Sequence, residues 1–78
     1  MSLAEQIKQQ QVEQLSLLVK WFGTQKMLAN RLGVSKQTVS NWVVRGRISA
    51  TAAKNAQNAT KGVFTKEDLR PDVIEWSE

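Results

Sequence analysis

The 78-residue sequence predicts an all-α protein of four to five short helices, and three observations lead to this fold class. Each of the four glycines follows a segment of helical character, and glycine is preferred just past a helix end because it accepts a left-handed backbone. Strand signals are weak, since the chain has little apolar alternation and neither an Asn-Gly nor an Asp-Gly turn. The length favours one domain, 1–78, and the absence of cysteine and histidine excludes disulfides and the usual zinc ligands.

The first helix is expected from about Ala4 to Phe22. Ser2 and Glu5 have the spacing of a capping box, in which the hydroxyl and the carboxylate each bond an otherwise unpaired backbone N–H. Apolar residues recur along this helix at helical spacing and are expected to face the core. These residues are Val12, Leu15, Val19 and Phe22.

Two shorter helices are expected within residues 24–44, and their pattern indicates a pair that crosses at a steep angle over a turn. Ala29 supplies the small residue needed at the crossing, and Gly33 supplies a turn residue that tolerates positive φ. Ser35 is the expected N-cap of the second helix, which extends to about Val44. Apolar residues at fixed offsets hold the pair together and against the first helix: Leu28, Leu32, Val34, Val39 and Trp42. This arrangement is typical of the DNA-binding helix-turn-helix, whose second helix enters the major groove.

The remaining residues are expected to form a fourth helix and a C-terminal tail. The fourth helix begins near Ser49 or Thr51, ends near Thr60, and places mostly alanines inward, so it packs closely but buries little area. Thr65 and Asp68 have the spacing of another capping box and open the tail, residues 65–78. A short β segment near residues 63–65 is the alternative for the connection between them.

The charge distribution is that of a protein with a polyanionic partner. The net charge is +4, and no aspartate or glutamate occurs between Glu13 and Glu67. A solvated surface usually mixes both signs, whereas a block of one sign suits a polyanion; chance in a mildly basic protein is the other reading. The cations in this interval are Lys20, Lys26, Arg31, Lys36, Arg45, Arg47, Lys54, Lys61 and Lys66.

Residues 22–76 resemble phage Cro and repressor proteins. The segment Phe22-Gly23-Thr24-Gln25 through Arg45-Gly46-Arg47 is similar to Cro-like regulators, including the YdaS-type antitoxin-like proteins. The ending Asp68-Leu69-Arg70-Pro71-Asp72, followed by Trp76, resembles the Glu-Leu-Arg-Pro-Asp ending of that group. The resemblance implies a lambda-repressor/Cro-like fold and a repressor of phage or prophage transcription. It does not cover the N-terminal half of the first helix, which is longer than usual.

The exposed residues near the start of the second helix of the pair are expected to face base edges. Glutamine and asparagine can bond bidentately to adenine, lysine can donate to guanine, and serine is permissive. The expected base-contacting residues are Lys36, Gln37, Ser40 and Asn41.

A second set of residues is expected to bond phosphates, which positions the protein without reading sequence. The set comprises Thr24, Gln25, Lys26, Arg45 and Arg47. The family resemblance implies that Gln25 bonds a phosphate through its backbone N–H and helps to orient a recognition side chain, with Thr24 beside it as N-cap.

The function predicted from these observations is that of a sequence-specific double-stranded DNA-binding transcriptional regulator. A homodimer on a two-fold operator is expected, with its contact surface around Val63, Phe64 and residues 73–76. The alternatives are an antitoxin-like regulator and a protein-interaction module that uses the long first helix. RNA binding is less well supported, because exposed aromatic residues for base stacking are not expected in the basic region.

Other function classes find little support in the sequence. An enzyme is not expected, since the chain has no histidine, cysteine or glycine-rich phosphate loop. No cofactor, metal or small-molecule ligand is expected either. The sequence has no run of 18 apolar residues and no signal-peptide pattern, so a membrane partner is not expected and the cytoplasm is the expected location.

Overall fold

The computed structural model describes residues 2–73. Within them the chain forms five α-helices and no strand, which confirms the all-α fold class. The helices are α1 (Leu3–Phe22), α2 (Gln25–Leu32), α3 (Lys36–Arg45), α4 (Ala50–Ala59) and α5 (Lys66–Leu69).

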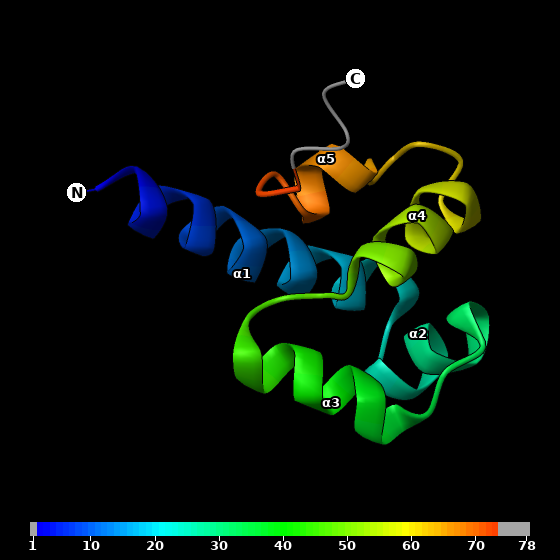
Figure 1. The fold of residues 1–78 in the computed structure, drawn as a ribbon. Helices are drawn as coiled ribbons and strands as arrows, with labels where there is room; N and C mark the ends of the chain where they lie inside the picture. The colour runs from blue at the N-terminus through cyan, green and yellow to red at the C-terminus, as the bar shows by residue number, and fades with distance from the viewer. Residues whose placement is uncertain (1, 74–78) are drawn as a thin grey trace.

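The long helix α1 lies between the other elements, as Figure 1 shows. α3 lies below it in this view and α5 above it, while α2 and α4 gather around its C-terminal end. α1 contacts α2, α3 and α5, and α2 packs most extensively on α3. The arrangement leaves one side of α3 without any covering helix.

Each helix begins after a serine or threonine whose side-chain oxygen accepts the backbone N–H three residues later. The donor–acceptor distances are 3.1–3.3 Å. Such caps satisfy one of the N–H groups that lack a partner in the first turn, so they fix the start of each helix. The N-caps are Ser2, Thr24, Ser35, Ser49 and Thr65.

All five helices contribute side chains to the core, and the face that α1 turns toward it differs from the expected one. Leu15 and Leu18 are buried, and Val19 and Phe22 pack against the core in part. Val12, which was expected to face inward, is 44% exposed, so that prediction is wrong. The buried stripe of α1 follows Gln11, Leu15 and Leu18, and Val12 lies about 100° around the helix from Gln11.

The connection between α4 and α5 is a turn organised by the buried side chain of Thr60. The Thr60 hydroxyl donates to the Ala56 carbonyl at 2.8 Å and accepts the Phe64 N–H at 3.1 Å. Phe64 consequently turns into the core, where it is 7% exposed. The β segment suggested near residues 63–65 is therefore wrong, because the Phe64 N–H is used by a side chain within the turn rather than by a neighbouring strand.

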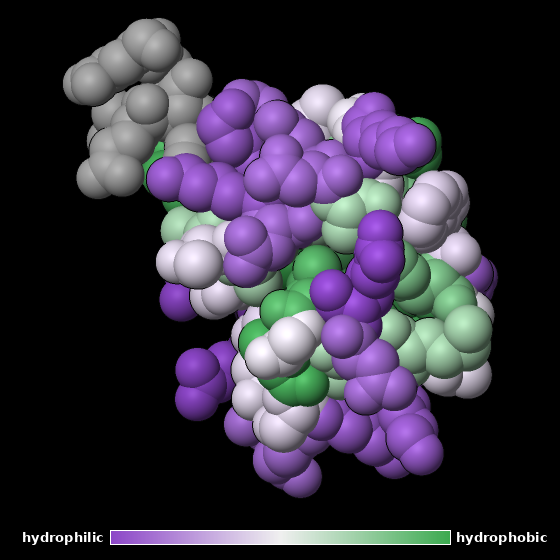
Figure 2. Space-filling view, turned by 90° about the vertical axis from the view of Figure 1, so that its right-hand side faces the viewer, coloured by the Kyte–Doolittle hydropathy of each residue, from purple (hydrophilic) through white to green (hydrophobic). Residues whose placement is uncertain are grey.

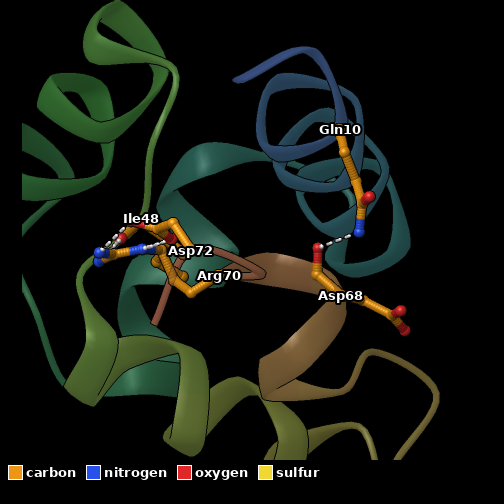
Figure 3. Close-up of polar contacts among 5 residues, drawn as sticks. All are labelled: Gln10, Ile48, Asp68, Arg70 and Asp72. Carbon is orange, nitrogen blue, oxygen red and sulfur yellow. Dashed lines mark hydrogen bonds and ion pairs between the residues drawn. The ribbon is translucent and has the colours of Figure 1, made fainter. Parts of the chain in front are cut away.

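α5 and the segment after it are tied to two distant parts of the chain, as Figure 3 shows. The Arg70 guanidinium donates to the Ile48 carbonyl at 2.9 Å and to both carboxylate oxygens of Asp72 at 2.8 and 2.9 Å. The Gln10 side chain donates to the Asp68 carbonyl at 3.3 Å. Because Ile48 lies in the loop between α3 and α4, Arg70 supports the segment that leaves α3.

We expect Arg70→Met to lower the free energy of unfolding by about 1.5–3 kcal/mol, because the Ile48 carbonyl loses a charged donor. Urea denaturation measures the change. Arg31→Met is the matched control, since Arg31 is exposed on α2, and it should shift stability by less than about 0.5 kcal/mol. Equal stability of the two variants would contradict a structural role for Arg70.

The pH dependence of the same variant gives a second check. The hydrogen bond from the Arg70 guanidinium holds the pKa of Asp72 below its ordinary value. A carboxylate with a depressed folded pKa stabilises the protein above its unfolded pKa, about 3.9, and this contribution is lost as the pH falls through the folded pKa. Arg70→Met should therefore lose less stability between about pH 5 and pH 2 than the parent protein does. If the stability of Arg70→Met and that of the parent protein changed in parallel with pH, Arg70 would not be the cause of the lowered pKa of Asp72.

Candidate DNA interface

The turn between α2 and α3 has the geometry that the crossing of two short helices needs. Gly33 adopts a left-handed conformation with φ of 71°. Its N–H donates to the Asn30 carbonyl at 3.3 Å, and the Val34 N–H donates to the Ala29 carbonyl at 3.0 Å. This pattern ends a helix and reverses the chain sharply, so that Ser35 can cap α3 two residues later.

The structure places the expected apolar residues of the helix pair in or against the core. Leu28, Ala29 and Val39 are almost fully buried, and Leu32 and Val34 pack against the core in part. The side chain of Trp42, 7% exposed, is likewise part of the core and is not available to stack on a base. The two helices thus pack as one unit. Its outer side is the side of α3 that faces away from the core.

The outer side of α3 carries three of the four expected base-contacting residues. Lys36, Gln37 and Asn41 are exposed. The Gln37 side-chain amide donates to the Asn41 amide oxygen at 3.1 Å, so the two amides lie together on one face. Figure 2 views the molecule from the right-hand side of Figure 1, and hydrophilic residues dominate its lower part, at the level of α3.

The fourth expected base-contacting residue, Ser40, is partly turned toward α2. Its hydroxyl donates to the Gln25 side-chain oxygen at 2.9 Å, and both residues are half-buried. The structure thus joins a residue expected to bond phosphate with one expected to face a base. The bond fixes the first turn of α2 against the middle of α3, which sets how the two helices meet a surface together.

The cations expected to bond phosphates are placed at two ends of the helix pair. Lys26 is exposed in the first turn of α2, while Arg45 and Arg47 are exposed at the end of α3 and just after it. Arg45 and Arg47 line a shallow depression of about 360 Å³ together with Lys8, from the N-terminal half of α1. Lys8 was not predicted as a site residue, because it lies outside the acid-free interval and only the packing of α1 brings it there.

Among residues 2–73, no ion pair joins an acidic group to a cation of α2 or α3. In the part of the chain that the structure describes, the ion pairs are Lys66–Glu67 and Arg70–Asp72, each at 2.8 Å. Both lie in or just after α5, and the Lys66 ammonium lowers the pKa of Glu67 by hydrogen bonding. Arg47 is near enough to Asp72 to add a weak lowering of that pKa, so Arg47 is less isolated from acids than Arg45 is.

Two other kinds of site are absent from residues 2–73. These residues contain no group of three histidine, cysteine, aspartate or glutamate residues that could hold a metal ion. No helix among them is long and apolar enough to cross a membrane.

Comparison with known proteins gives two matches. The family model described as bacterial toxin YdaS matches residues 15–78. The "Regulatory protein cro" of Pseudomonas phage D3 is 54% identical over 56 residues, which cover 69% of this chain and 75% of that protein. No solved structure matches the chain. The family match leaves out the N-terminal part of α1, as the sequence resemblance did. The two matches confirm that resemblance: the chain belongs to the family whose model is described as bacterial toxin YdaS, and it is a relative of a phage Cro protein.

Proposed function

We propose that this protein is a sequence-specific double-stranded DNA-binding transcriptional repressor that places α3 in the major groove. The observation that carries the proposal is the outer side of α3, where Lys36, Gln37 and Asn41 are exposed on a helix that the core holds rigidly. The major groove is about 12 Å wide and admits an α-helix with such side chains toward the base edges. The relative named a regulatory protein supports the regulatory role.

The charges at the two ends of the helix pair support the same orientation. A helix that enters the groove brings its flanking segments close to the two phosphate backbones. The phosphate groups are anionic, so cationic side chains in these segments bind them. Lys26 is at one end and Arg45 with Arg47 at the other, and the nearest acids along the chain are Glu13 and Glu67. Thr24 and Gln25 lie at the first turn of α2 beside Lys26, where backbone N–H groups suit a phosphate oxygen.

A homodimer on DNA belongs to the proposal, because one module of this size buries too little surface for tight specific binding. Two copies would then read half-sites about 34 Å apart. Of the residues expected at the dimer surface, Val63 is 59% exposed, whereas Phe64 lies in the core and cannot take part. Residues 74–76 of that surface lie outside the described residues.

Selection of bound sites from a random duplex library tests the proposed function. We expect one enriched sequence with two-fold symmetry, bound at least about 10³-fold more tightly than a scrambled duplex. Two-fold symmetry in the enriched sequence is the result expected if two copies bind side by side. A library that shows no enriched sequence, with binding that depends on charge alone, would contradict sequence-specific recognition.

A toxic effect on bacteria is the second candidate, and the description of the family suggests it. Induced expression in a bacterial host, with growth as the readout, tests it. If toxicity arises from DNA binding, Asn41→Ala should restore growth. If toxicity persists in this variant, the half-exposed Leu17 and Trp21 on α1 are the surface to vary next, as expected of a protein-interaction module.

The salt dependence of binding tests the phosphate contacts. We expect log affinity to fall linearly with log salt concentration, because each phosphate contact releases condensed counterions. Arg45→Ala should lower the steepness by about one unit and leave the preferred sequence unchanged. Arg45 gives the cleaner result than Arg47, since Arg47 also lies near Asp72.

The salt experiment needs a control for stability, because a cation in the last turn of a helix also interacts with the helix dipole. Thermal unfolding of Arg45→Ala provides it. Normal unfolding together with an unchanged salt slope would mean that Arg45 does not touch the DNA backbone.

A further inference from the structure

Val44 is the most exposed of the large apolar residues in the part of the chain that the structure describes. Its side chain is 86% exposed, although it lies within α3 two residues after the buried Trp42. Single exposed apolar residues are common and by themselves indicate nothing. The position of Val44 on α3, however, indicates a role.

Val44 shares the outer face of α3 with the two amides. It follows Gln37 by about two helical turns, and at 100° per residue it lies only about 20° around the helix from Gln37 and about 60° from Asn41. The hydrogen bond between these two amides marks the face to which Val44 belongs. Its neighbour Val43 points elsewhere, into an apolar groove of about 330 Å³ beside Val12 and Val19 of α1.

In the major groove, the base edges carry a single kind of apolar group, the C5-methyl group of thymine. A valine side chain cannot bond to phosphates or to base donors and acceptors, but it can bury its methyl groups against that methyl. On a face whose other exposed residues are polar, an aliphatic side chain therefore distinguishes thymine from cytosine without a hydrogen bond.

We propose that Val44 reads the C5-methyl group of a thymine in the site that α3 binds. The inference rests on the proposed function, because it requires α3 to lie in the major groove. The axial distance from Gln37 to Val44 is about 10 Å. With about 3.4 Å per base pair, the thymine lies within about three base pairs of the base that Gln37 contacts.

The experiment replaces each thymine of the selected site by uracil, one at a time, which removes only the methyl group. For the parent protein we expect one position in each half-site where the replacement weakens binding about three- to tenfold, as the loss of a buried methyl contact predicts. Val44→Ala should bind the thymine and uracil forms of that position equally. Its folding is checked by thermal unfolding, and little change is expected at so exposed a position.

Val43→Ala is the matched control, since it shortens the adjacent valine of the same helix on a different face. It should keep the sensitivity to uracil. Equal binding of all uracil sites by the parent protein would overturn the inference while leaving DNA recognition intact, and so would a uracil effect that persists in Val44→Ala. A selection that enriches no site would overturn the proposed function, and the inference with it.

Discussion

Replacing Gly46 by alanine is expected to lower the free energy of unfolding by about 2–5 kcal/mol, one of the largest effects of any single methyl group in this protein. Gly46 ends α3 in the left-handed region with φ of 73°, where a side chain costs about 1–2 kcal/mol. A Cβ atom there would also lie 2.7 Å from a methyl carbon of Val12 on α1. The clash adds a packing term because α1 and the end of α3 would have to separate.

Gly33 provides the matched control for this prediction. It ends α2 with φ of 71° and the same pair of hydrogen bonds, but a Cβ atom there would meet nothing within 4 Å. Gly33→Ala should therefore show the backbone cost alone, about 1–2 kcal/mol. Chemical denaturation compares the two variants.

The packing term can be isolated with Val12→Ala, which removes the methyl that the new Cβ would meet. In this background, Gly46→Ala should cost no more than Gly33→Ala does. A double-mutant cycle that gives no coupling between positions 12 and 46 would contradict the contact between α1 and the end of α3.

Loss of either amide on the outer face of α3 is expected to weaken binding to the selected site by about 1–3 kcal/mol. Gln37→Ala removes the proposed bidentate contact to a base and also the partner of Asn41, since the two side chains are hydrogen-bonded. Asn41→Ala does the same in reverse. Binding to random DNA should change far less, because phosphate contacts supply that affinity.

The hydrogen bond between the two amides leads to an expectation for the variant that lacks both of them. Residues in one hydrogen-bonded network do not act independently, so Gln37→Ala with Asn41→Ala should cost less than the two single effects combined. Fluorescence anisotropy on selected and scrambled duplexes measures all four proteins. Equal losses on both duplexes would remove these residues from sequence recognition.

The sequence predicted the elements of this fold well because their signals are local. A cap such as Ser35 acts on an N–H three residues away, and a glycine such as Gly33 ends the helix directly before it. Both signals can be read without knowing the tertiary structure. The helix-turn-helix needs small and apolar residues at fixed offsets over a short stretch, so it too could be recognised directly.

The errors occurred where burial depends on distant partners. Apolar residues occur around much of α1, and only the packing of the other helices decides that Leu18 is buried while Val12 is half-exposed. Val63 and Phe64 suit a strand locally, but the Thr60 hydroxyl and the core turn this segment into a tight connection. Local propensity gave way to tertiary contacts in both cases.

The polar contacts that shape the candidate site could not be predicted either. Ser40 bonds Gln25 from fifteen positions away, and Arg70 reaches the Ile48 carbonyl across twenty-two. Lys8 joins Arg45 only because α1 extends alongside the end of α3. The types of residue at the site were evident from the sequence, whereas their pairing required the fold.

Directed cleavage of the selected duplex tests most directly whether α3 lies in the major groove, as proposed. The chain has no cysteine, so Lys36→Cys and Glu67→Cys each provide a single thiol for a DNA-cleaving iron chelate. Lys36 begins α3, whereas Glu67 lies on α5, on the other side of α1 in Figure 1. We predict cleavage inside each half-site from position 36 and none from position 67; cleavage from position 67 with none from position 36 would contradict the account.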